Sequence, residues 1–300
     1  MGIRDSVVVR FVVFVAERFP PAAYLPLIAL FTAAGYVPAA VTQGRPLDPV
    51  RYGIAAVAVA TALLHMRIED DLKDAEVDRV ARPWRPLPRG LVTPRVLEVA
   101  GAGTMLAAVT LAAVLGPVAL AGFLPAAGYV ALADLEFLGR TRSHSDLVAY
   151  ALVHSPMVPL LLAFAWFASP GAAPDAALAA LVLIGWGTGL GMEVARKTYA
   201  RDEERPFVET YSAALGRTRA LGLGAVAMGV GLVGVALYAV VAGAGAGLVV
   251  AALTAGGIVV VATRLLRDRG HRATELVGTS MGAAILLCPI GIALATRAAA

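Results

Sequence analysis

The sequence predicts an all-α integral membrane protein in which nine transmembrane helices surround a central cavity beneath a cytoplasmic cap. Hydrophobic residues make up 59% of the chain and charged residues only 15%, whereas about a quarter of the residues in a soluble domain are charged. Apolar runs long enough to cross about 30 Å of hydrocarbon recur over the whole length. We therefore expect residues 1–300 to form a single membrane domain.

The predicted spans follow a short segment that does not cross the bilayer. In residues 1–20, Arg10 and Glu17 interrupt an apolar run and no clear small-residue cleavage site follows. These features favour an interfacial segment with an amphipathic helix over 6–19, not a signal peptide. The nine spans are then expected at 21–42, 50–68, 93–115, 117–137, 146–168, 176–197, 215–242, 245–266 and 274–297.

The distribution of charged residues supports this order of spans. When the loops are assigned alternately to the two sides, 22 of the 25 Lys and Arg residues fall on one side, and Arg45, Arg51 and Arg297 fall on the other. Of the 21 acids, only Asp48 and Asp175 lie on the poor side. The positive-inside rule makes the rich side cytoplasmic, as in a multi-pass protein of the cell membrane. The net charge of +4 then favours contact with anionic lipid or an anionic substrate, not with nucleic acid.

The first acidic motif, residues 67–92, begins at the cytoplasmic end of the second span. It contains six carboxylates in the ten residues 69–78. If this stretch is one helix, Asp71, Asp74 and Asp78 lie within an arc of roughly 60°. Like charges on one face repel unless a cation lies among them. Mg²⁺ prefers such oxygen ligands and keeps open positions for substrate phosphates, so the motif predicts a magnesium site.

The second acidic motif, residues 193–216, follows the sixth span and mixes both signs of charge. On a helix Glu193, Arg196 and Lys197 share a face, and Glu204 returns to that face if the helix continues to Pro206. Lys and Arg contact phosphate oxygens directly. We therefore expect a diphosphate to be held between the carboxylates of the first motif and the cations of the second.

These motifs resemble those of the UbiA superfamily of intramembrane prenyltransferases. The stretch from Asp70 to Asp78, followed by Arg-Pro-Leu-Pro-Arg-Gly at 85–90, is similar to the family's Asn-Asp-x-x-Asp-x-x-x-Asp motif and the Arg-Pro-Leu-Pro-x-Gly after it. The resemblance implies nine transmembrane helices and Mg²⁺ that bridges both acidic motifs to an isoprenyl diphosphate. It also implies a lateral, lipid-open cavity for the allylic chain.

Three positions depart from the family pattern. Asp70 stands where the family usually has Asn, and Glu193 replaces the usual leading Asp of the second motif. Where the family often has a Lys-Arg pair after an aromatic residue, this chain has Phe137-Leu-Gly-Arg140-Thr-Arg142. The first two changes point to a distant branch. The third leaves the acceptor open.

Residue chemistry and resemblance together give a candidate set of site residues. The expected metal ligands are Asp70, Asp71, Asp74, Asp78, Glu193, Asp202 and Glu204. The expected diphosphate ligands are Arg140, Arg142, Arg196 and Lys197. Asp71, Asp74, Asp78 and Lys197 carry the catalytic roles. Aromatic rings stabilise a carbocation, so Tyr150, His154, Trp166, Trp186 and Tyr199 are the expected walls of the prenyl-chain cavity.

Several other interpretations compete with prenyl transfer to an acceptor. A terpene cyclase of the same superfamily would use farnesyl or geranylgeranyl diphosphate without an acceptor. A transporter fits poorly, because the acids cluster at one membrane face and not near the midplane. There are also interpretations without a function. The first motif could be a solvated acidic loop, the second an ordinary cytoplasmic basic loop, and the aromatic residues could serve only in packing. The glycines at 185, 187, 189 and 191 are expected to allow close approach between helices.

Overall fold

The computed structural model describes residues 6–134, 152, 155–205, 208–245, 262, 266 and 269–299, and in these ranges every regular element is a helix. The helices are α1 (Val7–Arg18), α2 (Pro21–Thr42), α3 (Pro49–Lys73), α4 (Ala75–Ala81), α5 (Pro94–Val114), α6 (Pro117–Asp134), α8 (Met157–Ala168), α9 (Ala176–Arg196), α10 (Tyr211–Leu215), α11 (Arg217–Val241) and α13 (His271–Ala299).

Six of these helices, α2, α3, α5, α9, α11 and α13, are long and apolar enough to cross a membrane, and α6 and α8 are shorter apolar helices. Six of the nine predicted spans therefore correspond to candidate membrane helices, and α6 and α8 cover the described parts of two more, 117–137 and 146–168. The remaining span, 245–266, falls almost entirely outside them. The number nine stays a prediction.

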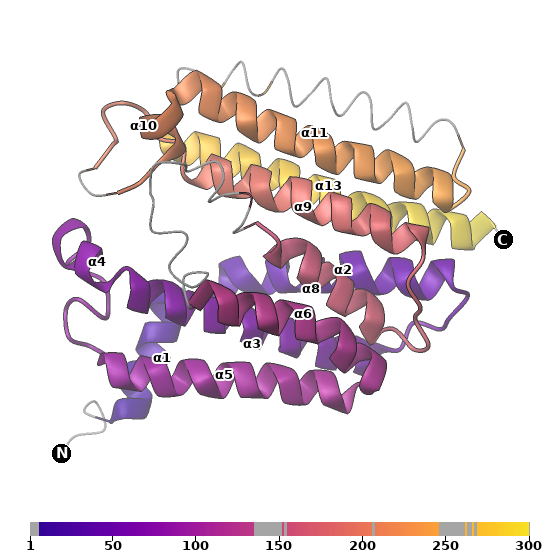
Figure 1. The fold of residues 1–300 in the computed structure, drawn as a ribbon, viewed down its shortest axis with the longest axis horizontal. Coiled ribbons are helices and arrows are strands. Elements are labelled where there is room, and N and C mark those ends of the chain that lie inside the picture. Colours follow the sequence, from indigo (N-terminus) through magenta and orange to yellow (C-terminus); the bar gives the residue numbers. More distant parts are fainter. Residues whose placement is uncertain are drawn as a thin grey trace.

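The spans form two layers, with α8 between them (Figure 1). In one layer α9 packs against α11 and α13, and in the other α3 packs against α5. Both layers meet at α8, which contacts α2, α6 and α9. The helix α9 is the most enclosed of the candidate spans, because two thirds of its most apolar window is buried.

Glycines set the short distance between α9 and α11. A Cβ atom added at Gly187 would lie 2.3 Å from the backbone nitrogen of Gly231 and 2.6 Å from the carbonyl oxygen of Ala227. Neither backbone atom can move without shifting the helix α11, so only glycine fits at this contact. The expectation that this glycine run allows close helix approach is confirmed.

One end of the bundle is closed by side chains that cap helices. Asp48 accepts hydrogen bonds from the first free backbone N–H groups of α3, and Asp175 does the same for α9. The Gln43 amide joins the end of α2 to this second cap, through the backbone of Ala173 and the Asp175 carboxylate. The two acids on the side poor in Lys and Arg thus both stabilise helix starts.

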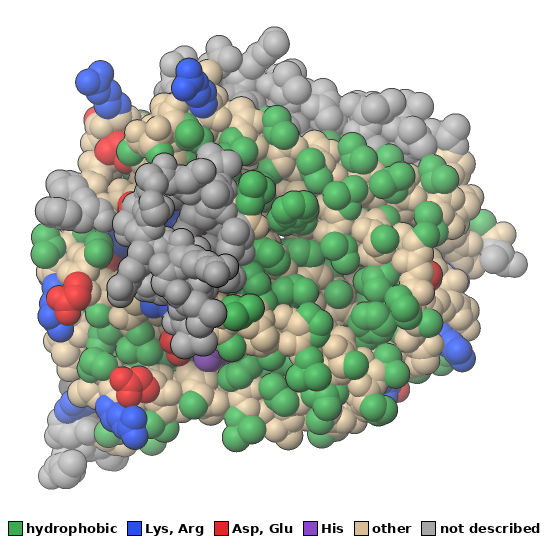
Figure 2. All heavy atoms as spheres, in the orientation of Figure 1, with side chains coloured by type: hydrophobic (Ala, Val, Ile, Leu, Met, Phe, Trp, Pro, Cys, Tyr) green, Lys and Arg blue, Asp and Glu red, His purple; other side chains and the backbone are tan. Residues whose placement is uncertain are grey.

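The other end carries most of the charge. On the face shown in Figure 2, hydrophobic side chains cover the broad middle, whereas most of the Lys, Arg, Asp and Glu side chains lie around the end that bears α4 and α10. The helix α1 lies at this same end (Figure 1). Its Phe14 is fully buried in a small apolar cluster with Ile68, Val92 and Leu97. Both acidic motifs therefore belong to one end of the molecule.

Candidate active site

The first acidic motif is not one continuous helix, so that part of the prediction is wrong. The helix α3 ends at Lys73, Asp74 forms the junction, and the short α4 covers Ala75–Ala81. The backbone nitrogen of Asp74 still bonds to the carbonyl of Asp70, and that of Asp78 bonds to the carbonyl of Asp74. The chain then leaves the helix at Arg82, and three prolines follow before residue 89.

Asp71 points into the protein and forms a buried ion pair. It is 2% exposed, and both of its carboxylate oxygens lie 3.0 Å from Nε of Arg18. A second arginine, Arg67, approaches from one turn earlier on α3 at 3.3 Å. Burial of a single carboxylate is costly, and two guanidinium groups offset that cost. Asp71 thus joins α1 to the end of α3.

Asp78 is held in the same way on the other side of the junction. It is 1% exposed, and Nη1 of Arg82 lies 2.9 Å from its Oδ1. The guanidinium of Arg85 contacts the other oxygen, Oδ2. Arg82 and Arg85 bracket the first proline of the loop that follows α4. Asp78 therefore fixes this loop against the short helix.

Asp70 and Asp74 differ from these two, because both are exposed. The Asp74 side chain is 51% exposed and lies 3.9 Å from Arg85. Partial burial and the negative charges of Asp70 and Asp78 raise the pKa of the Asp74 carboxyl above its ordinary value. Crowded like charges of this kind are stabilised by a cation. The hard carboxylate oxygens at 70 and 74 fit the requirements of Mg²⁺.

In the second motif, Glu193, Arg196 and Lys197 share a face at the end of α9, as predicted. Oε2 of Glu193 lies 2.7 Å from Nη2 of Arg196, and its Oε1 lies 3.0 Å from Nζ of Lys197. One carboxylate thus faces two cations, so this helix end carries a net positive charge. It suits an anion such as a diphosphate better than a second metal ion.

The prediction that the helix continues to Pro206 is wrong, because α9 ends at Arg196 and a loop follows. In this loop the Glu204 carboxylate accepts hydrogen bonds from the hydroxyls of Thr210 (2.7 Å) and Ser212 (2.6 Å). Glu204 therefore does not return to the face of Glu193. Its bonds hold the loop against the start of α10.

The neighbouring acids of this loop differ from each other. Glu203 accepts hydrogen bonds from the backbone nitrogens of Ala200 and His271, and these bonds lower the pKa of its carboxyl. Asp202, by contrast, is exposed. Of the three acids at 202–204, Asp202 alone is left facing solvent, because the other two hold the loop in place.

The two motifs act on each other electrostatically. The negative charge of Asp70 on α3 attracts Arg196 at the end of α9, and the positive charge of Arg67 opposes it. Within the described ranges, no three His, Cys, Asp or Glu side chains are arranged to hold a metal ion by themselves. Mg²⁺ does not need such a cage, since it commonly binds one or two carboxylates together with substrate phosphates.

The predicted aromatic walls lie in different places. Trp166 is fully buried near the far end of α8, and its ring nitrogen donates to the carbonyl of Ala173, a full α9 length from the motifs. Trp186 is 39% exposed on α9. Tyr199 stacks on His271 with ring centroids 3.9 Å apart, at the charged end. Arg140, Arg142, Tyr150 and His154 lie outside the described residues.

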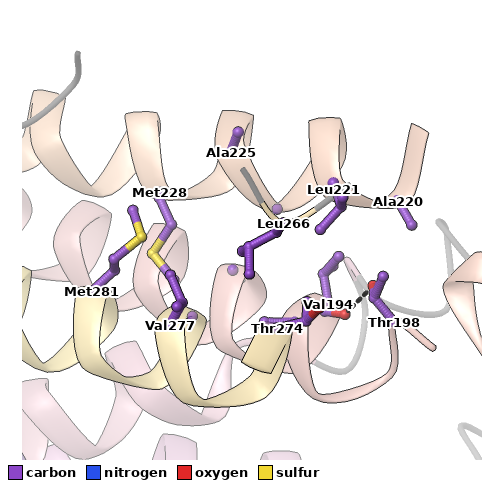
Figure 3. Close-up of a pocket in the computed structure, with 14 residues that line it drawn as sticks. Val194, Thr198, Ala220, Leu221, Ala225, Met228, Leu266, Thr274, Val277 and Met281 are labelled. Carbon is purple, nitrogen blue, oxygen red and sulfur yellow. Dashed lines mark hydrogen bonds between the residues drawn. The ribbon is translucent and has the colours of Figure 1, made fainter. Parts of the chain in front are cut away.

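A small apolar cavity of about 40 Å³ lies beneath the second motif (Figure 3). Its walls come from α9, α11, α13 and Leu266. Thr198 and Thr274 are its polar residues, and the Thr198 hydroxyl is already bonded to the carbonyl of Val194. The cavity takes its lining from the layer of α9, α11 and α13 and from Thr198 and Leu266, with no residue of the first motif, so it is not the chamber expected between the two motifs.

The sequence prediction missed the arginines that neutralise the buried acids. Arg67 and Arg82 each lie four residues from the aspartate that they pair with, which is the spacing of helix neighbours. That signal was present in the sequence. Arg18 is 53 residues from Asp71, and no local pattern reveals this contact.

Comparison with known proteins places this geometry in a family. The family model described as the UbiA prenyltransferase family matches residues 28–295. A structure of digeranylgeranylglyceryl phosphate synthase is 14% identical, with a TM-score of 0.67 over 95% of this chain and 99% of that chain.

Two archaeal structures show the same fold. A UbiA homologue from Aeropyrum pernix K1 has 15% identity and a TM-score of 0.67, and one from Archaeoglobus fulgidus, bound to DMAPP and Mg²⁺, has 15% identity and a TM-score of 0.58. Each alignment covers 90% of this chain and 97% of the other. No curated protein sequence matches. The family match covers most of the chain, and the chain therefore belongs to the UbiA prenyltransferase family.

Proposed function

We propose that this protein is a Mg²⁺-dependent intramembrane prenyltransferase that ionises an isoprenyl diphosphate and transfers the prenyl group to an acceptor. One observation carries the proposal. Asp70, an exposed carboxylate at the end of α3, lies near enough to the basic end of α9 for its charge to act on Arg196, and both lie at the charged end of an apolar bundle. Family membership and the homologue bound to DMAPP and Mg²⁺ support it.

The metal ligands that we propose are exposed carboxylates of the two motifs. Asp70 and Asp74 would hold the metal, with Asp202 as the carboxylate from the second motif. Asp71, Asp78 and Glu204, although predicted as ligands, are engaged in ion pairs or hydrogen bonds that stabilise the site. Mg²⁺ would neutralise the diphosphate and so make it a better leaving group.

Arg196 and Lys197 would bind the diphosphate oxygens. Their attraction to the diphosphate becomes stronger as negative charge builds on this leaving group. They therefore stabilise the transition state more than the bound substrate. In the reaction the allylic C–O bond breaks, and the diphosphate departs with the electron pair. The acceptor nucleophile then bonds to the allylic carbon and loses a proton.

Product analysis tests this function. The purified protein in lipid nanodiscs is supplied with Mg²⁺ and farnesyl or geranylgeranyl diphosphate, with and without a panel of phenols and lipid alcohols. We expect diphosphate release and a prenylated product only when an acceptor is present. Cyclic hydrocarbons or alcohols without acceptor would identify a terpene cyclase instead.

Matched variants connect the activity to the site. Asp70→Ala combined with Asp74→Ala is expected to reduce turnover at least about 100-fold, because two of the three proposed metal ligands are lost. Glu98→Ala is the control, since Glu98 is an exposed acid that pairs with Arg95 on α5. Full turnover by the double variant would contradict the metal assignment.

A further inference from the structure

The helix α1 lies before residues 28–295, the part of the chain that matches the family, yet its last turn contacts the first acidic motif. Arg18 is the last residue of α1. Its Nε contacts both oxygens of Asp71 at 3.0 Å, and its Nη2 lies 2.9 Å from Oδ1. The Arg18 side chain is only 15% exposed. This contact therefore joins α1 to the end of α3 through a largely desolvated ion pair.

The preceding residue, Glu17, binds the other flank of the same motif. Its Oε1 lies 2.7 Å from Nη2 of Arg89, and its Oε2 lies 2.9 Å from Nη1. Two parallel hydrogen bonds of this kind fix orientation as well as distance. Arg89 also donates to the carbonyl of Trp84, so the loop after α4 is fixed together with it.

The helix α1 can hold the motif in position because α1 itself is packed against the protein. Phe14 is fully buried among Ile68 at the end of α3, Val92 in the loop before α5 and Leu97 at the start of α5. Neighbouring residues on a helix project about 100° apart. Once Asp71 is held toward α1, the direction of the adjacent Asp70 is set as well.

We propose that α1 is a positioning clamp for the metal site, in which Arg18 and Glu17 hold the two flanks of the first acidic motif. The inference rests on the proposed function, because it takes Asp70 and Asp74 as the metal ligands. Side chains that orient metal ligands through hydrogen bonds commonly change metal affinity by 10-fold to 100-fold when removed. Arg18 and Glu17 are positioning residues, because they act on the motif through Asp71 and Arg89.

Metal affinity measured without turnover tests the clamp. Mn²⁺ replaces Mg²⁺ as the probe, inorganic diphosphate replaces the substrate, and bound Mn²⁺ is counted by electron paramagnetic resonance in nanodiscs. We expect Arg18→Met to weaken Mn²⁺ binding about 10-fold. Arg18→Lys keeps the charge and is expected to lose less. Arg95→Met removes an arginine from an exposed ion pair at the start of α5 and is the matched control.

A second experiment reverses the charges of the exposed ion pair between Glu17 and Arg89. Glu17→Arg opposes Arg89 with a like charge, and we expect it to weaken Mn²⁺ binding. The double variant Glu17→Arg with Arg89→Glu restores the attraction and is expected to restore affinity. A rescue of this kind separates positioning from simple loss of stability. This rescue also tests the clamp if the Arg18→Met variant does not fold.

The possible failures are distinguishable. If the wild-type protein does not bind Mn²⁺ in the presence of diphosphate, the proposed function fails and the clamp fails with it. If the wild type binds but Arg18→Met binds as tightly, the clamp alone is overturned. Glu17→Arg with wild-type affinity would overturn the clamp in the same way.

Discussion

The aspartates of the first motif differ in what surrounds them. Asp71 and Asp78 are buried between pairs of arginines, whereas Asp70 and Asp74 are exposed. Helix periodicity gives the angle between these side chains but not the side that faces the protein. The sequence could therefore predict the acidic cluster and its charge. It could not predict which carboxylates are committed to ion pairs.

Replacing Asp71 should destabilise the fold. Asp71→Asn leaves the guanidinium groups of Arg18 and Arg67 in a largely buried site without their counter-ion. Loss of one partner from a buried ion pair typically costs about 3 kcal/mol or more. We expect a clearly lower melting temperature in detergent, measured without metal. A melting temperature equal to that of the wild type would show that the pair contributes little.

Replacing Asp74 should have the opposite effect on stability. Its pKa is raised in the folded state, so the ionised carboxylate is less favourable there than in the unfolded chain. This unfavourable contribution is absent below the unfolded pKa and is complete above the folded one. At neutral pH without metal, Asp74→Asn should therefore raise the melting temperature while it abolishes Mn²⁺ binding. A destabilisation as large as that of Asp71→Asn would contradict the distinction between the two residues.

At the scale of helices, the spans could be predicted, but the course of the chain beyond the end of α9 could not. The length of each apolar run predicted α2, α3, α5 and α9 closely, because a bilayer imposes that length. The end of α9 depends on hydrogen bonds instead. Glu203 and Glu204 bind the backbone nitrogen of Ala200 and the hydroxyls of Thr210 and Ser212, which offers the chain an alternative to the helix.

The contact between α9 and α11 makes a testable prediction. Gly187→Ala places a methyl group against the backbone of Gly231, and overpacking of this kind typically costs 1–3 kcal/mol, so we expect a loss of about 2 kcal/mol in an unfolding titration. Gly229→Ala is the control, because its added Cβ would meet nothing within 4 Å. Since alanine favours helix more than glycine, Gly229→Ala should be neutral or stabilising. Equal losses from both variants would mean that the close approach does not matter.

At the scale of the whole molecule, topology brings the two motifs to one end. Between α3 and α9 the chain passes through α5, α6 and α8, and each passage reverses its direction. The helices α3 and α9 therefore run the same way, and their final turns lie at the same end. This much follows from counting spans in the sequence. The contact of Arg18 on α1 with Asp71 does not, because a contact over 53 residues leaves no local pattern.

The orientation of the bundle in the membrane gives the last prediction. The charged end carries the motifs, and the positive-inside rule predicts that this end faces the cytoplasm. In a Cys288→Ser background, single cysteines are introduced as Arg201→Cys at the charged end and Leu47→Cys, 41% exposed, at the other. A membrane-impermeant thiol reagent added to intact cells should label only Leu47→Cys. In inverted vesicles it should label only Arg201→Cys. The cysteine-free protein is the control, and labelling of both positions from one side would contradict the predicted topology.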